Sequence, residues 1–157
     1  MSDLLQIFLT AGLTIVGGVI LFIFGEFAKV LIIQPLQKYN EQVQLIRDRL
    51  DFYANRVTNY FSEEPNDEEW KLIQQINADF RSAATQLSSK YAGIMRRKLL
   101  IRLKIIPTPE MVEEAYRHLM LLSNNVPRRG RRDRDGEHDP IMINHDAIEK
   151  VKAALRP

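Results

Sequence analysis

The chain has 157 residues, a formal net charge of +2 and no cysteine. This length suits one domain, or one domain with an anchor, and the small net charge argues against a general polyanion-binding protein. The lack of cysteine excludes disulfides, thiolate metal sites and cysteine nucleophiles. The mean hydropathy of -0.23 averages an apolar beginning and a highly charged remainder.

The first predicted element is a membrane-spanning helix within residues 1–33. Residues 4–25, LLQIFLTAGLTIVGGVILFIFG, contain no Asp, Glu, Lys or Arg. About 20 apolar residues are enough to cross a bilayer core of roughly 30 Å. One alternative is a cleavable signal peptide, but the positive start, the shorter apolar stretch and the cleavage site typical of that class do not occur here. The other is the buried core helix of a soluble protein. We expect a transmembrane anchor.

The charges that flank this anchor predict its orientation. Lys29, Lys38, Arg47 and Arg49 follow the apolar stretch, and no Lys or Arg precedes it. Basic residues stay on the cytoplasmic side of a membrane. We therefore expect a protein of the bacterial inner membrane, with the N-terminus outside and the C-terminal part in the cytoplasm.

Small residues recur along the anchor with the spacing of a helix-packing face. Thr10, Thr14 and Gly18 are four residues apart, and Gly25 follows seven residues later. Such faces allow close contact between helices in lipid, so self-association of the anchor is one hypothesis. The alternative is that glycine and threonine are simply common in membrane spans.

Residues 34–126 are predicted to form a helical hairpin followed by a third helix. Two apolar stripes of helical period flank the segment SEEPNDEE, where Asn66 and Glu69 form a capping box. The short connection predicts antiparallel packing of the two helices. Leu45 and Phe52 widen the first stripe and suggest a further packing neighbour. The first stripe consists of Leu36, Tyr39, Val43, Ile46, Leu50, Tyr53, Val57 and Tyr60, and the second of Trp70, Ile73, Ile76, Phe80, Ala83, Leu87, Tyr91 and Ile94.

The remaining elements follow from two further start signals. Thr108 and Pro109 predict the start of the third helix, whose buried stripe is Val112, Ala115, Leu119 and Leu122. Residues 127–140 are predicted to be a basic mobile loop, and residues 141–157 a C-terminal helical segment in which a short helix starts at a second capping box, Asp146 with Glu149. The expected fold class is therefore all-α: a single transmembrane helix followed by an antiparallel helical bundle of three to four helices.

The segment 95–107, MRRKLLIRLKIIP, mixes leucine and isoleucine with basic residues at the end of the second long helix. An antiparallel return brings this end back to the membrane, where apolar side chains can enter the headgroup layer and basic ones can meet anionic lipid. The alternatives are a continuation of the helix with its apolar side in the core, a mixture of both roles, and nucleic-acid binding, which the lack of interleaved aromatic residues disfavours. The predicted membrane interface consists of Arg96, Arg97, Lys98, Leu99, Leu100, Arg102, Leu103 and Lys104.

The densest basic cluster lies in the predicted loop. Its members are Arg128, Arg129, Arg131, Arg132 and Arg134. Nucleic acid or anionic lipid are its candidate ligands. The alternative is a solvated loop that Asp133 and Asp135 partly neutralise.

No residue pattern points to an enzyme, a cofactor, a metal site or a small-molecule substrate. His118, His138 and His145 lack the spacing of zinc ligands. No nucleophile elbow, phosphate-binding loop or dinucleotide-binding motif occurs. The acidic stretch at 63–69 is explained by a solvated turn and helix start.

The chain resembles a family of uncharacterised small bacterial proteins that have an N-terminal membrane span and a helical cytoplasmic domain. The resemblance is carried by LIIQPLQKYNEQVQLIRDRLDFYANRV, IIPTPEMVEEAYRHLMLLSNNV and AIEKVKAAL. It covers most of residues 20–157, except the arginine loop, which looks like a longer insertion. It implies no activity, cofactor or catalytic residue.

These observations together predict a single-pass membrane protein. Its helical domain is expected to act by protein–protein interaction or self-association at the cytoplasmic face of the membrane, with the lipid bilayer as a further partner. Two alternatives are a membrane-bound nucleic-acid binder that uses the arginine loop, and a membrane-active effector of defence or toxicity whose span oligomerises.

Overall fold

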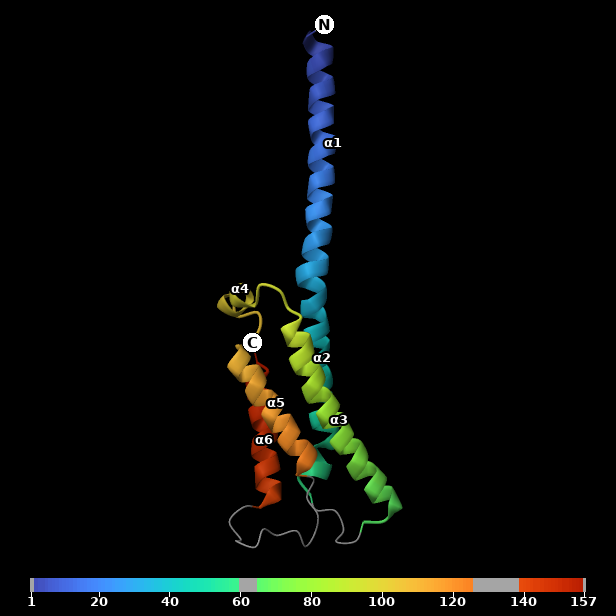
Figure 1. Ribbon diagram of the computed structural model, residues 1–157, viewed down its shortest axis with the longest axis vertical. Coiled ribbons are helices and arrows are strands. Elements are labelled where there is room, and N and C mark those ends of the chain that lie inside the picture. Colours follow the sequence, from blue (N-terminus) through green and yellow to red (C-terminus); the bar gives the residue numbers. More distant parts are fainter. Residues whose placement is uncertain (1, 60–64, 126–138, 157) are drawn as a thin grey trace.

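The computed structural model describes residues 2–59, 65–125 and 139–156. Over these ranges the chain is helical and contains no strand, which confirms the predicted all-α class. A long apolar helix, α1 (Ser2–Ala28), extends away from a helical domain formed by residues 34–156 (Figure 1). The helices that pack on one another in this domain are α2 (Gln34–Val57), α3 (Asp67–Ala92), α5 (Pro109–Asn124) and α6 (Pro140–Ala154). Successive members of this set run in opposite directions (Figure 1).

A π-helical turn, η1 (Lys29–Ile33), joins α1 to α2 without a break in the helix. Pro35 stands in the first turn of α2 and has no backbone N–H to donate. The turn before it is widened, and the Gln34 N–H bonds to the carbonyl of Lys29, five residues back. A widened turn of this kind shifts the backbone hydrogen bonds by one residue and so accommodates the missing donor of Pro35. The anchor and the domain are therefore connected by a continuous helix.

Side-chain caps begin three of the helices. At α3 the Glu69 N–H donates to Asn66 Oδ1 at 2.8 Å, and the Asn66 N–H donates to Glu69 Oε2 at 3.3 Å, which confirms the predicted capping box. Thr108 caps α5 as predicted, by accepting from the Met111 N–H at 3.4 Å.

The predicted start of the last helix is wrong. Helix α6 begins six residues earlier than Asp146, at Pro140, because the Asp139 carboxylate caps the Ile141 N–H at 3.0 Å. Proline fits a first helical turn because its missing N–H would be unpaired there. Asp146 lies in the second turn and forms an ion pair with Lys150 at 2.8 Å.

The core lies where the apolar stripes of α2, α3, α5 and α6 meet. Nearly all the predicted stripe residues within the described ranges are buried there, Leu36 partly so. Trp70 is the exception, with 38 % of its surface exposed. Helix α2 has a second neighbour, α6, besides α3. Leu45 and Phe52 do not take part in this packing within the described residues, since both are exposed and Phe52 retains 77 % of its surface.

Polar side chains connect the helices at several points inside this domain. Gln42 on α2 donates to the carbonyl of Ala83 at 3.2 Å and accepts from Lys90 Nζ at 3.0 Å. Asn144 on α6 bonds to the ends of α2 and α5. Tyr53 on α2 donates its hydroxyl to Asp79 Oδ2 on α3 at 2.7 Å. These bonds satisfy buried groups and so specify one arrangement of the helices.

The buried tyrosines predict a loss of stability in alkali. Burial and then the hydrogen bond to Asp79 raise the pKa of Tyr53 to about 12, against about 10 in an unfolded chain. The stabilisation is complete below pH ~10 and is lost as the pH rises from there towards the folded pKa. We expect the thermal midpoint of the full chain, followed by circular dichroism, to fall across this range. Tyr53→Phe should flatten the fall, and an identical pH dependence in both proteins would contradict the assignment.

Candidate membrane interface

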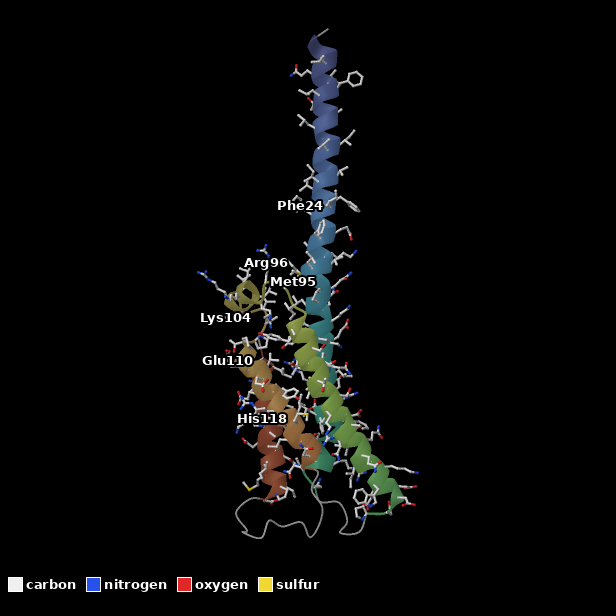
Figure 2. All side chains as sticks on the ribbon, in the orientation of Figure 1. Phe24, Met95, Arg96, Lys104, Glu110 and His118 are labelled. Atoms are coloured by element: carbon white, nitrogen blue, oxygen red, sulfur yellow. The ribbon has the colours of Figure 1, made fainter. Side chains whose placement is uncertain are left out.

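Helix α1 exposes its apolar side chains from Leu5 onwards. Phe22 and Phe24 keep 70 % and 69 % of their surface, and neither they nor their neighbours pack on the helical domain. In the part of the chain that the structure describes, the continuous helix that contains α1 is the one long and apolar enough to cross a membrane. Figure 2 shows Phe24 on the isolated part of this helix, beyond the end of the domain.

The small residues of α1 are compatible with a lipid environment. The hydroxyl of Thr10 donates to the carbonyl of Gln6 at 2.8 Å, and that of Thr14 donates to the carbonyl of Thr10 at 2.9 Å. Both hydroxyl protons are thus satisfied within the helix, as lipid requires. Gly18 and Gly25 have open space where a side chain would stand. Thr10, Thr14, Gly18 and Gly25 are all exposed, so the face that they form has no partner within the described chain.

The end of the apolar stretch is marked by an ion pair. Glu26 and Lys29 lie one helical turn apart, with 3.6 Å between Lys29 Nζ and Glu26 Oε1. Both side chains are about half exposed. A paired carboxylate and ammonium at this position suit the edge of a bilayer better than its centre.

The basic and apolar segment after α3 forms a separate short helix, α4 (Arg97–Arg102), and does not continue α3. Helix α3 ends at Ala92, and the chain leaves it through Gly93 to Arg96, which has a left-handed conformation with φ 54°. Lys104, beyond the other end of α4, has φ 55°. Figure 1 shows α4 at the end of the helical domain from which α1 leaves, and Figure 2 places Met95, Arg96 and Lys104 there.

The side chains of this segment divide into a buried and an exposed set. Leu100 and Ile106 belong to the core, and Ile101 is partly buried against it. The sequence predicts Leu100 at the membrane interface, but its side chain is buried in the core. The exposed set contains Met95, Arg96, Arg97, Lys98, Leu99, Arg102, Leu103, Lys104 and Ile105. The segment therefore contributes to the core on one side and exposes basic and apolar side chains on the other.

Tyr91, the next-to-last residue of α3, holds this segment at both ends. Its hydroxyl donates to the carbonyl of Pro107 at 2.9 Å, and its ring lies 5.6 Å from the guanidinium of Arg97. The Tyr91 ring also packs against the ring of Tyr39 on α2, with 5.7 Å between the ring centroids. Burial raises the pKa of Tyr91 above its ordinary value, so its hydroxyl keeps its proton for this bond further into alkali than a free tyrosine would. Of the basic residues, Arg97 is thus engaged with the domain.

The exposed cations beside it are unpaired. Among the described residues, no carboxylate forms an ion pair with Arg96, Lys98, Arg102 or Lys104. Four positive charges and four exposed apolar residues consequently share one surface. We call this surface the α4 platform: Met95, Arg96, Lys98, Leu99, Arg102, Leu103, Lys104 and Ile105.

A small cavity lies beside the platform, between α2 and the chain that leaves α4. Its volume is about 220 Å³, and its lining includes Tyr39, Arg47, Ile105 and Leu155. The Tyr39 hydroxyl is buried without a hydrogen-bond partner among the described residues, and burial raises its pKa. Arg47 donates to the carbonyl of Leu155 at 3.2 Å. The volume is below the range of about 300–1,000 Å³ typical of sites for drug-sized ligands.

The other candidate residues do not come together in a site. No group of acidic and histidine side chains that could hold a metal occurs within the described residues. His118 lies on α5 beside Glu114, at 3.9 Å from Nε2 to Oε1, and His145 is exposed on α6. His138 and the arginines 128, 129, 131, 132 and 134 lie outside the described residues. The sequence pattern did not reveal the roles of Tyr91 and Asn144, because a lone buried tyrosine or asparagine has no periodic signature.

The chain was compared with models of known families, with curated proteins and with solved structures, and none of the three comparisons finds a match.

Proposed function

We propose that this chain is a single-pass protein of the bacterial inner membrane that acts through association of its cytoplasmic helical domain with another protein or with a second copy. In this view α1 crosses the bilayer and the domain is an antiparallel bundle tethered at the cytoplasmic face. The bacterial assignment follows from the family resemblance of the sequence.

The observation that carries the proposal is the full exposure of α1. An apolar surface of this length has no partner within the described chain, and exposed apolar surface on this scale is rare in soluble monomers. From Leu4 to Gly25 the helix measures about 33 Å, which matches the ~30 Å of a bilayer core. Lipid would cover this surface completely.

The orientation follows from charge on the domain side of α1. Lys29 and Lys38 lie in the first turns after the apolar stretch, and Arg96, Lys98, Arg102 and Lys104 lie at the same end of the domain. Basic residues close to a span favour the cytoplasmic side. These charges support an orientation with the helical domain in the cytoplasm.

The surface for a protein partner is proposed on α2. Phe52 is the most exposed aromatic residue of the described helical domain, and Leu45 lies two helical turns before it on the same helix. The Phe52 ring packs edge-on against that of Tyr53, at 4.9 Å between centroids. Large exposed aromatic residues are frequent anchors of protein–protein contacts. The face of α1 that contains Thr10, Thr14 and Gly18 offers a second surface, for a copy of the same helix.

The membrane topology can be tested in cells, because the natural chain has no cysteine. A single cysteine at Met142, an exposed position on α6, should react with a membrane-impermeant maleimide only after the inner membrane is opened. A single cysteine in a loop of a periplasmic protein serves as the positive control. Labelling of Met142→Cys in intact cells, or recovery of the chain in the aqueous fraction without detergent, would contradict the proposal.

The same cells test the association. A photo-crosslinking phenylalanine analogue at Phe52 should give a defined adduct, either of twice the chain's mass or with a second protein. The matched position is Thr85, which is exposed on α3 and hydrogen-bonded only to its own helix. Equal yields at Phe52 and Thr85 would remove α2 as the partner surface.

A further inference from the structure

We infer that the α4 platform binds the anionic phospholipid leaflet beside α1 and holds the helical domain against the membrane in a fixed position. This inference rests on the proposed function, because it takes α1 to span the bilayer.

The position of α4 along the molecule agrees with the level of the lipid headgroups. The apolar stretch of α1 ends at Gly25, and η1 begins four residues later, which is about 6 Å along the helix. A headgroup layer adds roughly 5–7 Å to each side of the hydrocarbon core. Figure 1 shows α4 level with the start of α2, which follows η1, so the platform lies at the outer edge of this layer, within reach of its long side chains.

The composition of the platform matches an anionic lipid surface. Its apolar residues, Met95, Leu99, Leu103 and Ile105, are each 43 % exposed or more. They alternate with four cations that have no ion-pair partner in the described chain. Leucine and isoleucine can enter the boundary between headgroups and acyl chains, while long basic side chains extend their charges to the phosphates.

The platform is held in its shape before any lipid is present. Leu100 and Ile106 fix its inner side in the core, and Tyr91 holds Arg97 at one end and the carbonyl of Pro107 at the other. Left-handed conformations at two non-glycine residues, Arg96 and Lys104, cost energy and persist only where surrounding contacts enforce them. A surface that is already ordered loses little entropy on binding.

Continuity with the span favours lipid over a protein as the occupant. Val30, Leu31 and Ile33 of η1 are exposed, so apolar surface extends from α1 to the level of the platform. A tethered domain also meets the leaflet at a high effective concentration, so a weak surface suffices. Each cation should strengthen contact with an anionic leaflet about fivefold.

The test places spin labels on the full chain in nanodiscs, made either of phosphatidylcholine alone or of phosphatidylcholine with phosphatidylglycerol. Three single-cysteine proteins are compared: Leu103→Cys on the platform, Met142→Cys at the far end of α6, and Val16→Cys in the middle of α1. Collisions with oxygen and with a water-soluble nickel chelate report the depth of each label. We expect the Leu103 label to be shielded from nickel only in the anionic discs, the Met142 label never, and the Val16 label always.

Charge variants identify the contribution of the cations. Arg102→Gln with Lys104→Gln should weaken the docked state by about 30-fold and return the Leu103 label to nickel access. Arg56→Gln with Lys71→Gln makes the same change in net charge at exposed positions on α2 and α3 and should leave the label shielded.

The outcomes separate the two proposals. A deep Val16 label with a nickel-accessible Leu103 label would overturn the platform and leave the anchor intact. A Val16 label accessible to nickel would overturn the anchor and the platform together. If the Leu103 label is shielded equally in both kinds of disc, the platform does not depend on anionic lipid. If it is shielded only when a disc holds two chains, the platform contacts a second copy of the chain.

Discussion

Replacing Phe80 by alanine is expected to lower the free energy of unfolding by about 3–5 kcal/mol, the range for a fully buried phenylalanine. Phe80 lies in the middle of α3 with no exposed surface, and its ring meets the edge of Tyr53 at 5.9 Å between centroids. The truncation removes both the buried apolar area and this aromatic contact, and it leaves a cavity that a close-packed core closes only in part. Urea unfolding of the full chain in detergent, followed by circular dichroism, measures the effect.

Phe52 provides the matched control. Its ring also touches Tyr53, at 4.9 Å between centroids, but 77 % of its surface is exposed. Phe52→Ala should therefore change the free energy of unfolding by less than about 0.5 kcal/mol, as for other surface substitutions. Equal losses for the two alanine variants would show that the packing of α3 against α2 is not as described.

Replacing Asn144 by alanine is expected to lower the free energy of unfolding by about 2–4 kcal/mol, because two buried carbonyls lose their donors. The Asn144 amide donates to the carbonyl of Val57 at 2.7 Å and to that of Asn125 at 2.8 Å. These carbonyls belong to the C-terminal ends of α2 and α5, where a helix cannot satisfy its own acceptors. One side chain of α6 thus supplies the hydrogen-bond donors for the terminal carbonyls of two other helices.

The aspartate variant tests this explanation against simple loss of volume. Asn144→Asp keeps the shape but has no N–H, and its carboxylate would face the same two carbonyl oxygens. One carboxylate oxygen would keep the Asn125 Nδ2 donor that now bonds to Asn144 Oδ1 at 3.1 Å, but the other would face the carbonyl oxygens. At neutral pH the variant should destabilise the protein at least as much as alanine, since a buried charge without a cation beside it is costly. Asn55→Ala, at an exposed position on α2, should be nearly neutral. A stable Asn144→Asp protein would contradict the assigned hydrogen bonds.

Most of the helical framework was predictable from local patterns. The apolar stripes of α2, α3 and α5 predicted their buried residues, because helical period and burial are directly linked. The capping residues Asn66 and Thr108 predicted two helix starts for a similar reason, since a cap acts within three residues of itself. The last helix was placed too late because Asp146 and Glu149 imitate a capping box, whereas Asp139 with Pro140 forms the actual start.

The candidate site was predictable in composition but not in geometry. The mixture of basic and apolar residues at 95–107 was visible in the sequence, and its position near the end of α1 agrees with an antiparallel return. The break after Ala92 was marked only by Gly93, the C-cap of α3, and the apolar stripe that continues to Ile94 masked this stop signal. The sequence also did not show which leucines of this segment are buried: Leu100 is buried, while Leu99 and Leu103 are exposed.

The sequence by itself determined the long apolar stretch, the helical class and the faces that each long helix buries, because hydrophobic period, length and capping act over one or two turns. Only the tertiary structure decided that α3 stops before α4, and that Tyr91 contacts both Arg97 and the carbonyl of Pro107. It also decided that Asn144 donates to the carbonyls at the C-terminal ends of α2 and α5. These features depend on contacts between residues that are far apart in the chain, such as the 87 positions between Asn144 and Val57. Such contacts exist only after the helices have packed.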